Sequence, residues 1–130
     1  MPPASSKPAL FHTVFIMFRS HATEAQKKEI FDRYQTLGED CGGVEAGILF
    51  LQVAHNLDQR KGMHMVEVAI FRDAAALQAF RKHPWHQELT NILGTFADWA
   101  AGDINISLAD LPRPPIPQPQ GFSEEELNRN

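Results

Sequence analysis

Cysteine is almost missing from this sequence: Cys41 is the only one among 130 residues. A single cysteine excludes an intrachain disulfide and suits a reducing compartment such as the cytoplasm. Long apolar runs are also missing, because the longest, around residues 15–18, is far too short to cross a bilayer. No repeat of solenoid period is present. The sequence therefore predicts one soluble domain with no membrane partner.

An excess of positive charge is lacking as well. Twelve basic side chains stand against sixteen acidic ones, which gives a net charge of -4. A nucleic-acid surface needs a clustered basic face, so nucleic acid is not expected as a partner. Residues 1–9 contain no apolar segment and predict a short disordered leader.

Four segments have the aromatic and β-branched composition of strands. They cover residues 11–19, 44–53, 63–71 and about 98–107. A first helix is expected after Thr23, which forms a capping-box signature with Gln26. Its buried stripe consists of Ile30, Phe31, Tyr34 and Leu37, and glycines 38, 42 and 43 are expected to end it.

A second helix is expected to begin after Asp73, a good N-cap residue. Pro84 interrupts this helix, because the residue before a proline avoids the helical conformation. The break is therefore expected at His83, with Pro84 opening a new turn as its first residue.

The order βαββαβ predicts an α+β, ferredoxin-like domain over residues 10–108, with a four-stranded antiparallel sheet and both helices on one face. The first two strands are apolar on both faces. The face that the helices leave open would then be a large apolar patch, which is typical of an interface. Since most soluble oligomers are symmetric, we expect a homodimer in which a second copy covers this face.

Residues 109–130 differ in composition from the rest of the chain. Five prolines lie between Pro112 and Pro119 and favour an extended polyproline II conformation. Three interpretations stay open for this tail: a solvated segment, a strap across the partner subunit, or a proline-rich ligand for another domain. Ile116 and Phe122 are the candidate anchors of a docked tail.

Histidine is the most promising source of chemistry, because its unperturbed pKa lies nearest neutrality. The sequence has six, and His21 and His55 fall in expected loops where water reaches them. His12 and His64 each lie early in a strand. A single inward histidine is more often a core residue than a catalyst, but several in one small domain favour a pocket.

The other two histidines, His83 and His86, flank the expected helix break in the sequence HPWH. In a continuous helix they could share a metal, but the break at Pro84 weakens that geometry. No HExxH motif and no cysteine pair are present, so no metal site is expected. Cys41 has no base placed beside it by the sequence, and no glycine-rich phosphate loop exists. We therefore expect no cofactor.

Together these features resemble the stress-responsive A/B-barrel family, a branch of the dimeric α/β-barrel superfamily. The matching residues are His12 at the start of the first strand, MHMVEV at 63–68, HPWH at 83–86, and a last strand ending near Asp103. The resemblance covers about residues 10–107. It implies a dimer in which two sheets form a barrel.

The pattern is also similar to the plant polyketide cyclases of this family, which close a linear polyketide by an intramolecular aldol reaction without metal or cofactor. This resemblance implies that His86 is the general base and Tyr34 the second catalytic group. It assigns His12, His64, Phe80 and His83 to the substrate-binding site. The cyclases carry a catalytic tyrosine where this chain has Phe80, a departure that argues against cyclisation itself.

Three functions stay open at this point. The first is a cofactor-independent enzyme with His86 as general base, acting on an aromatic or polyketide-like compound. The second is a non-catalytic stress-associated or ligand-binding protein. The third is a cofactor-free or haem-dependent oxygenase, since the superfamily contains both.

Overall fold

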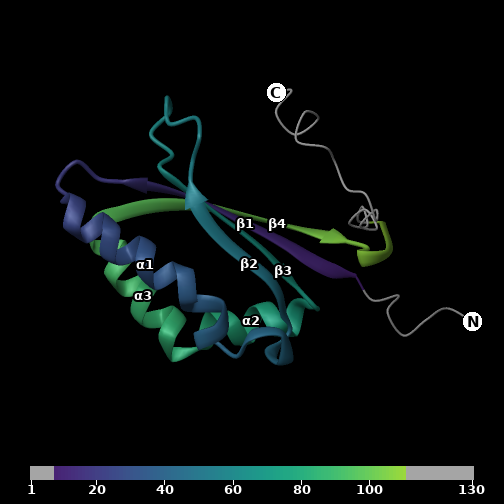
Figure 1. Ribbon diagram of the computed structural model, residues 1–130. Coiled ribbons are helices and arrows are strands. Elements are labelled where there is room, and N and C mark those ends of the chain that lie inside the picture. The colour runs from purple at the N-terminus through teal and green to yellow at the C-terminus, as the bar shows by residue number, and fades with distance from the viewer. Residues whose placement is uncertain (1–7, 111–130) are drawn as a thin grey trace, which may run out of the picture.

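The computed structural model describes residues 8–110 (Figure 1). The expected leader and proline-rich tail lie almost wholly outside these residues. The strands are β1 (Ala9–Phe18), β2 (Ile48–His55), β3 (Met65–Phe71) and β4 (Ala97–Ile106). The helices are α1 (Glu24–Asp40), α2 (Ala74–Lys82) and α3 (Pro84–Phe96), with short 3-10 turns at Gly43–Ala46 and Leu108–Asp110.

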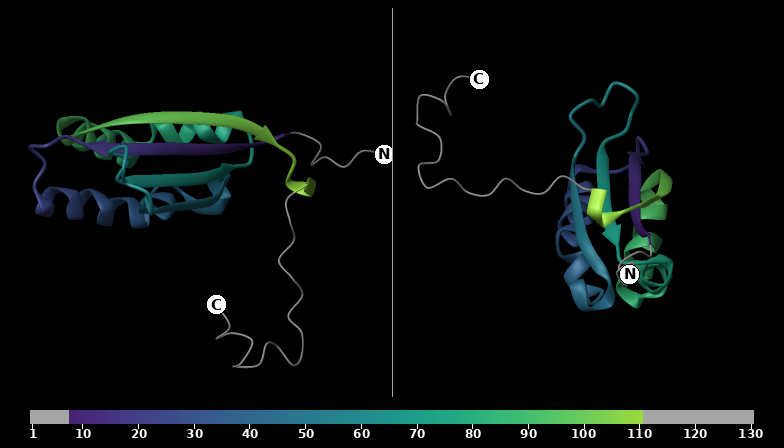
Figure 2. Two further views of the ribbon diagram at one scale, coloured as in Figure 1. Left: turned by 90° about the horizontal axis from the view of Figure 1, so that it is seen from above. Right: turned by 90° about the vertical axis from the view of Figure 1, so that its right-hand side faces the viewer.

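The four strands form one antiparallel sheet in the order β2-β3-β1-β4. All three helices lie on the same side of this sheet (Figures 1 and 2). The expected ferredoxin-like fold is therefore confirmed. β1 lies in the interior of the sheet, so His12 faces a neighbour on each side: Ala69 on β3 and Asp103 on β4.

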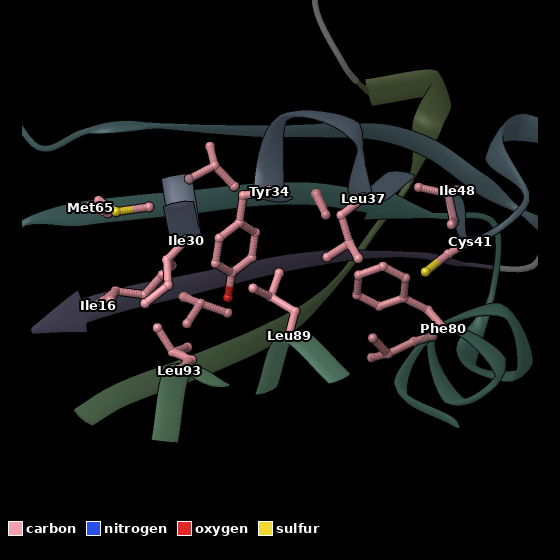
Figure 3. Packing of buried hydrophobic residues seen from close by; sticks show 14 of the residues in the cluster. Ile16, Ile30, Tyr34, Leu37, Cys41, Ile48, Met65, Phe80, Leu89 and Leu93 are labelled. Atoms are coloured by element: carbon pink, nitrogen blue, oxygen red, sulfur yellow. The ribbon is translucent and has the colours of Figure 1, made fainter. Parts of the chain in front are cut away.

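The core fills the space between the sheet and the helices. Alternate residues of β1, among them Val14 and Ile16, point into it. On the helical side, Ile30, Tyr34 and Leu37 form the buried stripe of α1, as their spacing predicts (Figure 3). Residues that recur every two positions in the strand and every three or four positions in the helix thus pack together in one apolar layer.

Local signals begin the three helices where the sequence predicts. The Thr23 hydroxyl accepts a hydrogen bond from the Gln26 amide at 3.1 Å, and the Gln26 side chain accepts one from the Thr23 amide at 2.8 Å. Asp73 caps α2 by accepting from the Ala76 amide at 2.8 Å. His83 has φ -64° and ψ 135°, so the chain leaves the helical region at the residue before Pro84.

Two expected boundaries are wrong, each for a reason that involves glycine. Residues 43–46 form a 3-10 turn, because Gly42 and Gly47 take left-handed φ values of 110° and 88° that no strand accommodates. α1 continues through Gly38, which packs closely on Leu51 of β2. α3 runs through Gly94 and ends at Phe96.

The sheet face opposite the helices is apolar, as the strand pattern predicts. It carries Phe11, Phe15 and Met17 of β1, Phe50 of β2, Val66, Val68 and Ile70 of β3, and Ile104 of β4. The Phe50 and Ile104 side chains are 45% and 60% exposed. An apolar face of this extent is typical of an interface. Within residues 8–110, no helix combines the length and the apolar character needed to cross a membrane.

Candidate active site

A pocket of about 270 Å³ opens between the sheet and the helices, where α2 turns into α3. Every helix and three of the strands contribute to its wall. The lining residues are His12, Val14, Tyr34, Glu67, Arg81, His86, Thr90, Leu93, Trp99 and Ala101.

His12 lies at the floor of this pocket between two carboxylates. Its Nδ1 lies 2.5 Å from Oδ1 of Asp103, and its Nε2 lies 3.2 Å from Oε2 of Glu67. Burial lowers the pKa of His12, but the attraction of the neighbouring Glu67 and Asp103 carboxylates outweighs it, so the pKa is raised. The imidazolium form of His12 is therefore favoured.

Glu67 is almost completely buried, with 2% of its side chain exposed. Its Oε2 lies within ion-pair distance of Nε2 of His12. Among the described residues it is the one buried side-chain oxygen or nitrogen without a hydrogen-bond partner. A buried oxygen of this kind costs free energy unless a ligand or water completes it.

His86 lies on the opposite wall, in the first turn of α3. Burial lowers its pKa, against a smaller raising effect of the Glu67 charge, so the neutral imidazole is favoured. Its Nδ1 lies 3.4 Å from the Thr90 hydroxyl, and its ring meets the Phe80 ring edge-on at 4.5 Å. A neutral histidine in a pocket has the protonation state of a general base.

The orientation of His86 is set by α3. His86 occupies a regular helical position, two residues after Pro84. It shares one face with Leu89 and Leu93, which are three and seven residues further along. The buried face of α3 thus aims the imidazole at the sheet.

Tyr34 contributes a phenol from α1. Its hydroxyl points across the core toward α3 (Figure 3). Burial raises the pKa of Tyr34, with a further contribution from the Glu67 charge, so the phenol is protonated and can donate a hydrogen bond. No protein acceptor within residues 8–110 uses that donor.

Arg81 and Trp99 lie nearest the solvent. The Arg81 guanidinium donates to Oδ2 of Asp103 at 3.2 Å, so this carboxylate is shared between Arg81 and His12. The Arg81 side chain and Trp99 are each about two-fifths exposed. The pocket therefore has a cation and an indole ring at its mouth.

The structure brings together three of the residues expected in the site: His86, Tyr34 and His12 line one pocket. Phe80 lies beneath it in the core and contacts the His86 ring. His83 caps α3, with Nδ1 accepting from the Trp85 amide at 3.2 Å.

His64 lies in a different cavity. Because β1 and β3 are antiparallel, residues early in each strand start at opposite ends of the sheet. His12 pairs with Ala69, whereas His64 donates its backbone N–H to Ile16 near the other end of β1. The two histidines therefore do not meet.

Sequence reasoning missed Glu67, Arg81, Thr90 and Trp99, and it used Asp103 only to mark a strand end. Glu67 did have a detectable signal. It stands on the buried side of β3 between Met65 and Ala69, where a charged residue needs a partner. Over residues 8–110, no three His, Cys, Asp or Glu side chains are arranged to hold a metal ion.

Residues 10–106 match the Stress responsive A/B Barrel Domain. The chain belongs to the stress-responsive A/B-barrel family. Among curated proteins, none matches the sequence.

Solved structures share the fold at low sequence identity. A dimeric ferredoxin-like protein of unknown function from Thermobifida fusca has a TM-score of 0.67 at 16% identity, over 78% of this chain and 93% of that one. A hydroxynitrile lyase from Passiflora edulis has a TM-score of 0.63 at 16% identity, over 77% and 94%. SnoaB, a cofactor-independent oxygenase from Streptomyces nogalater, has a TM-score of 0.58 at 14% identity, over 85% and 99%. At these identities the likeness establishes the fold of this A/B-barrel chain.

Proposed function

We propose that the pocket is the active site of a cofactor-independent enzyme that uses His86 as general base on a small aromatic or polyketide-like substrate. One observation carries the proposal. A histidine with a lowered pKa and a doubly paired histidine with a raised pKa line the same pocket. Titratable groups whose environments push their pKa values apart are typical of acid–base sites.

The chemistry follows from these protonation states. The neutral imidazole of His86 removes a proton from a carbon next to a substrate carbonyl, which leaves an enolate. The enolate carbon attacks a second carbonyl of the same molecule, so a carbon–carbon bond forms and the carbonyl π bond becomes an alkoxide. The His86 imidazolium returns its proton to that alkoxide, and the balance needs no oxidant or reductant.

Hydrogen-bond donors and positive charge around the pocket stabilise the enolate and alkoxide oxygens. The protonated phenol of Tyr34 donates a hydrogen bond, and the Arg81 guanidinium supplies positive charge. Phe80 brings no hydroxyl to this step. Its ring packs against His86 and contributes to the apolar surroundings that keep the imidazole neutral.

The similar folds support this proposal, since SnoaB is a cofactor-independent oxygenase and the Passiflora edulis protein is a hydroxynitrile lyase. The alternative is a non-catalytic ligand-binding protein with the same pocket. The haem-dependent alternative fits less well, because a pocket of about 270 Å³ is small for a macrocycle.

We further propose that the protein works as a cytoplasmic homodimer. The apolar sheet face opposite the helices needs cover, and related folds are described as dimeric. Two such faces would form a closed barrel, with a standard interface of about 1,600 Å². The single cysteine supports a reducing compartment.

The test compares wild type with His86→Ala and Tyr34→Phe for binding and turnover of a linear polyketide thioester or its acid. We expect both variants to bind, and turnover by His86→Ala to fall by about 10²–10⁴-fold, the range for a general base. His83→Ala is the matched control, since its side chain caps α3 outside the pocket. A wild type that binds without turnover would leave the non-catalytic alternative.

A further inference from the structure

A second cavity, of about 340 Å³, lies on the helix side of the sheet at the end away from Asp103. Its walls come from the first turns of α1, the ends of β1 and β2, the loop between β2 and β3, and the start of β3. It shares no lining residue with the His86 pocket. A dimer formed through the opposite sheet face would leave this cavity open.

Aromatic rings make up much of the wall. Phe31 and His55 stack in parallel, with ring centroids 4.4 Å apart and an interplanar angle of 3°. Phe18 and His64 form a second pair with centroids 5.8 Å apart. Flat rings at the edge of an open cavity favour a flat ligand, because stacked and edge-on ring pairs are both favourable.

His64 also has a defined tautomer. Its Nδ1 accepts a hydrogen bond from the Phe18 backbone amide at 3.0 Å, so its proton is on Nε2. Within residues 8–110 no protein acceptor is paired with that Nε2 proton. The cavity therefore has a donor available to a ligand.

Two lysines lie at the rim, and each is paired with one carboxylate. Lys27 lies 5.8 Å above the Phe18 ring and 3.1 Å from Glu24, and Lys28 pairs with Asp32 at 2.6 Å. Water reaches both pairs, since the Glu24 side chain is 92% exposed and the Lys28 and Asp32 side chains are 76% and 56% exposed. Exposed pairs of this kind are weak, so the lysines stay available to an anion.

We propose that this cavity is a second binding site, specific for a small planar aromatic carboxylate. The rings of Phe18, Phe31 and His55 hold the aromatic part. Lys27, Lys28 and the Nε2 proton of His64 hold the carboxylate. The volume lies at the lower end of ligand pockets and suits a compact ring compound. The site is independent of the reaction proposed for the His86 pocket.

The experiment is a titration of the full-length, ¹⁵N-labelled protein with benzoate, followed by amide chemical shifts. We expect saturable shifts in residues 23–31 and 55–65, with a dissociation constant of about 1 mM. Benzamide has the same ring without the charge, and acetate has the charge without the ring. Each should bind at least about tenfold more weakly.

Variants test which residues bind benzoate. The double variant Lys27→Gln/Lys28→Gln should weaken benzoate binding by about tenfold. His55→Leu, a change at an exposed position, should weaken it through loss of the stacked pair. Lys82→Gln removes an exposed lysine at the end of α2 and should have no effect, and His86→Ala should bind as wild type does.

Three results would overturn the proposal. The first is benzoate shifts that map to residues 81–90 and 99–103, since the ligand would then occupy the other pocket. The second is benzamide affinity equal to that of benzoate. The third is an absence of saturable binding up to about 10 mM. None of these depends on turnover, so failure here is distinct from failure of the proposed reaction.

Discussion

Replacing His12 by leucine should destabilise the protein strongly, because it leaves Glu67 without its counter-charge. The two side chains are 6% and 2% exposed, so solvent compensates little for the loss of the imidazolium. Asp103 keeps Arg81 as a partner and is one-third exposed, so it is not stranded in the same way. The expected loss of stability therefore comes from the buried carboxylate of Glu67.

Breaking a buried ion pair by removing one partner costs about 3–5 kcal/mol. With a urea m value of about 1–3 kcal/mol/M, a loss of 3 kcal/mol lowers the unfolding midpoint by at least about 1 M. The double variant His12→Leu/Glu67→Leu also removes the stranded charge. Since apolar replacement of a buried pair is often neutral or stabilising, it should recover most of the loss.

The assay is urea unfolding followed by circular dichroism at about pH 6 and at one fixed protein concentration, because an oligomer would make the midpoint depend on concentration. His21→Leu is the matched control. That histidine is exposed, and its one hydrogen bond, to the Thr95 carbonyl, should contribute about 1 kcal/mol or less to stability. Two results would refute the reasoning. One is that His12→Leu lowers the free energy of unfolding by less than about 1 kcal/mol. The other is that the double variant loses as much as the single variants His12→Leu and Glu67→Leu together.

Four further predictions follow from the same features. Because the pKa of His12 is raised on folding, the stability advantage of wild type over His12→Gln should be complete below pH 6.5 and shrink as pH rises through the folded-state value, which urea midpoints from about pH 5 to pH 9 would measure. The pKa of His86 is lowered, so kcat/KM should rise with pH to a plateau along an acidic limb that lies below pH 6.5; a limb above that value would argue against His86 as the base. Val68 lies at the centre of the open sheet face, and Val68→Asp should give monomers or insoluble protein, whereas a wild type that is monomeric by light scattering would contradict the dimer. Deleting residues 109–130 should lower the melting temperature by several degrees if the tail packs on the folded body, and an unchanged melting temperature would favour a solvated tail.

Short-range features were the ones that the sequence predicted best. The capping box of Thr23 and Gln26 and the break at Pro84 each depend on residues within three or four positions of one another. The alternation in β1 also predicted an apolar face that the helices leave open. Gly38 was the exception, because α1 continues through it although the sequence predicted that the helix would end there.

The partners of each functional side chain required the tertiary structure. Sequence alone selected His12, Tyr34 and His86 as residue types suited to proton transfer, but it gave no reason to pair His12 with Glu67 or with Asp103, which lies 91 positions away.

That pairing exists because β1 is an interior strand, so β3 brings one carboxylate to His12 and β4 brings the other. The same antiparallel register sends His64 to the far end of the sheet. A sequence determines which residues can ionise, whereas the strand order and register decide which charges meet and in which direction each pKa moves.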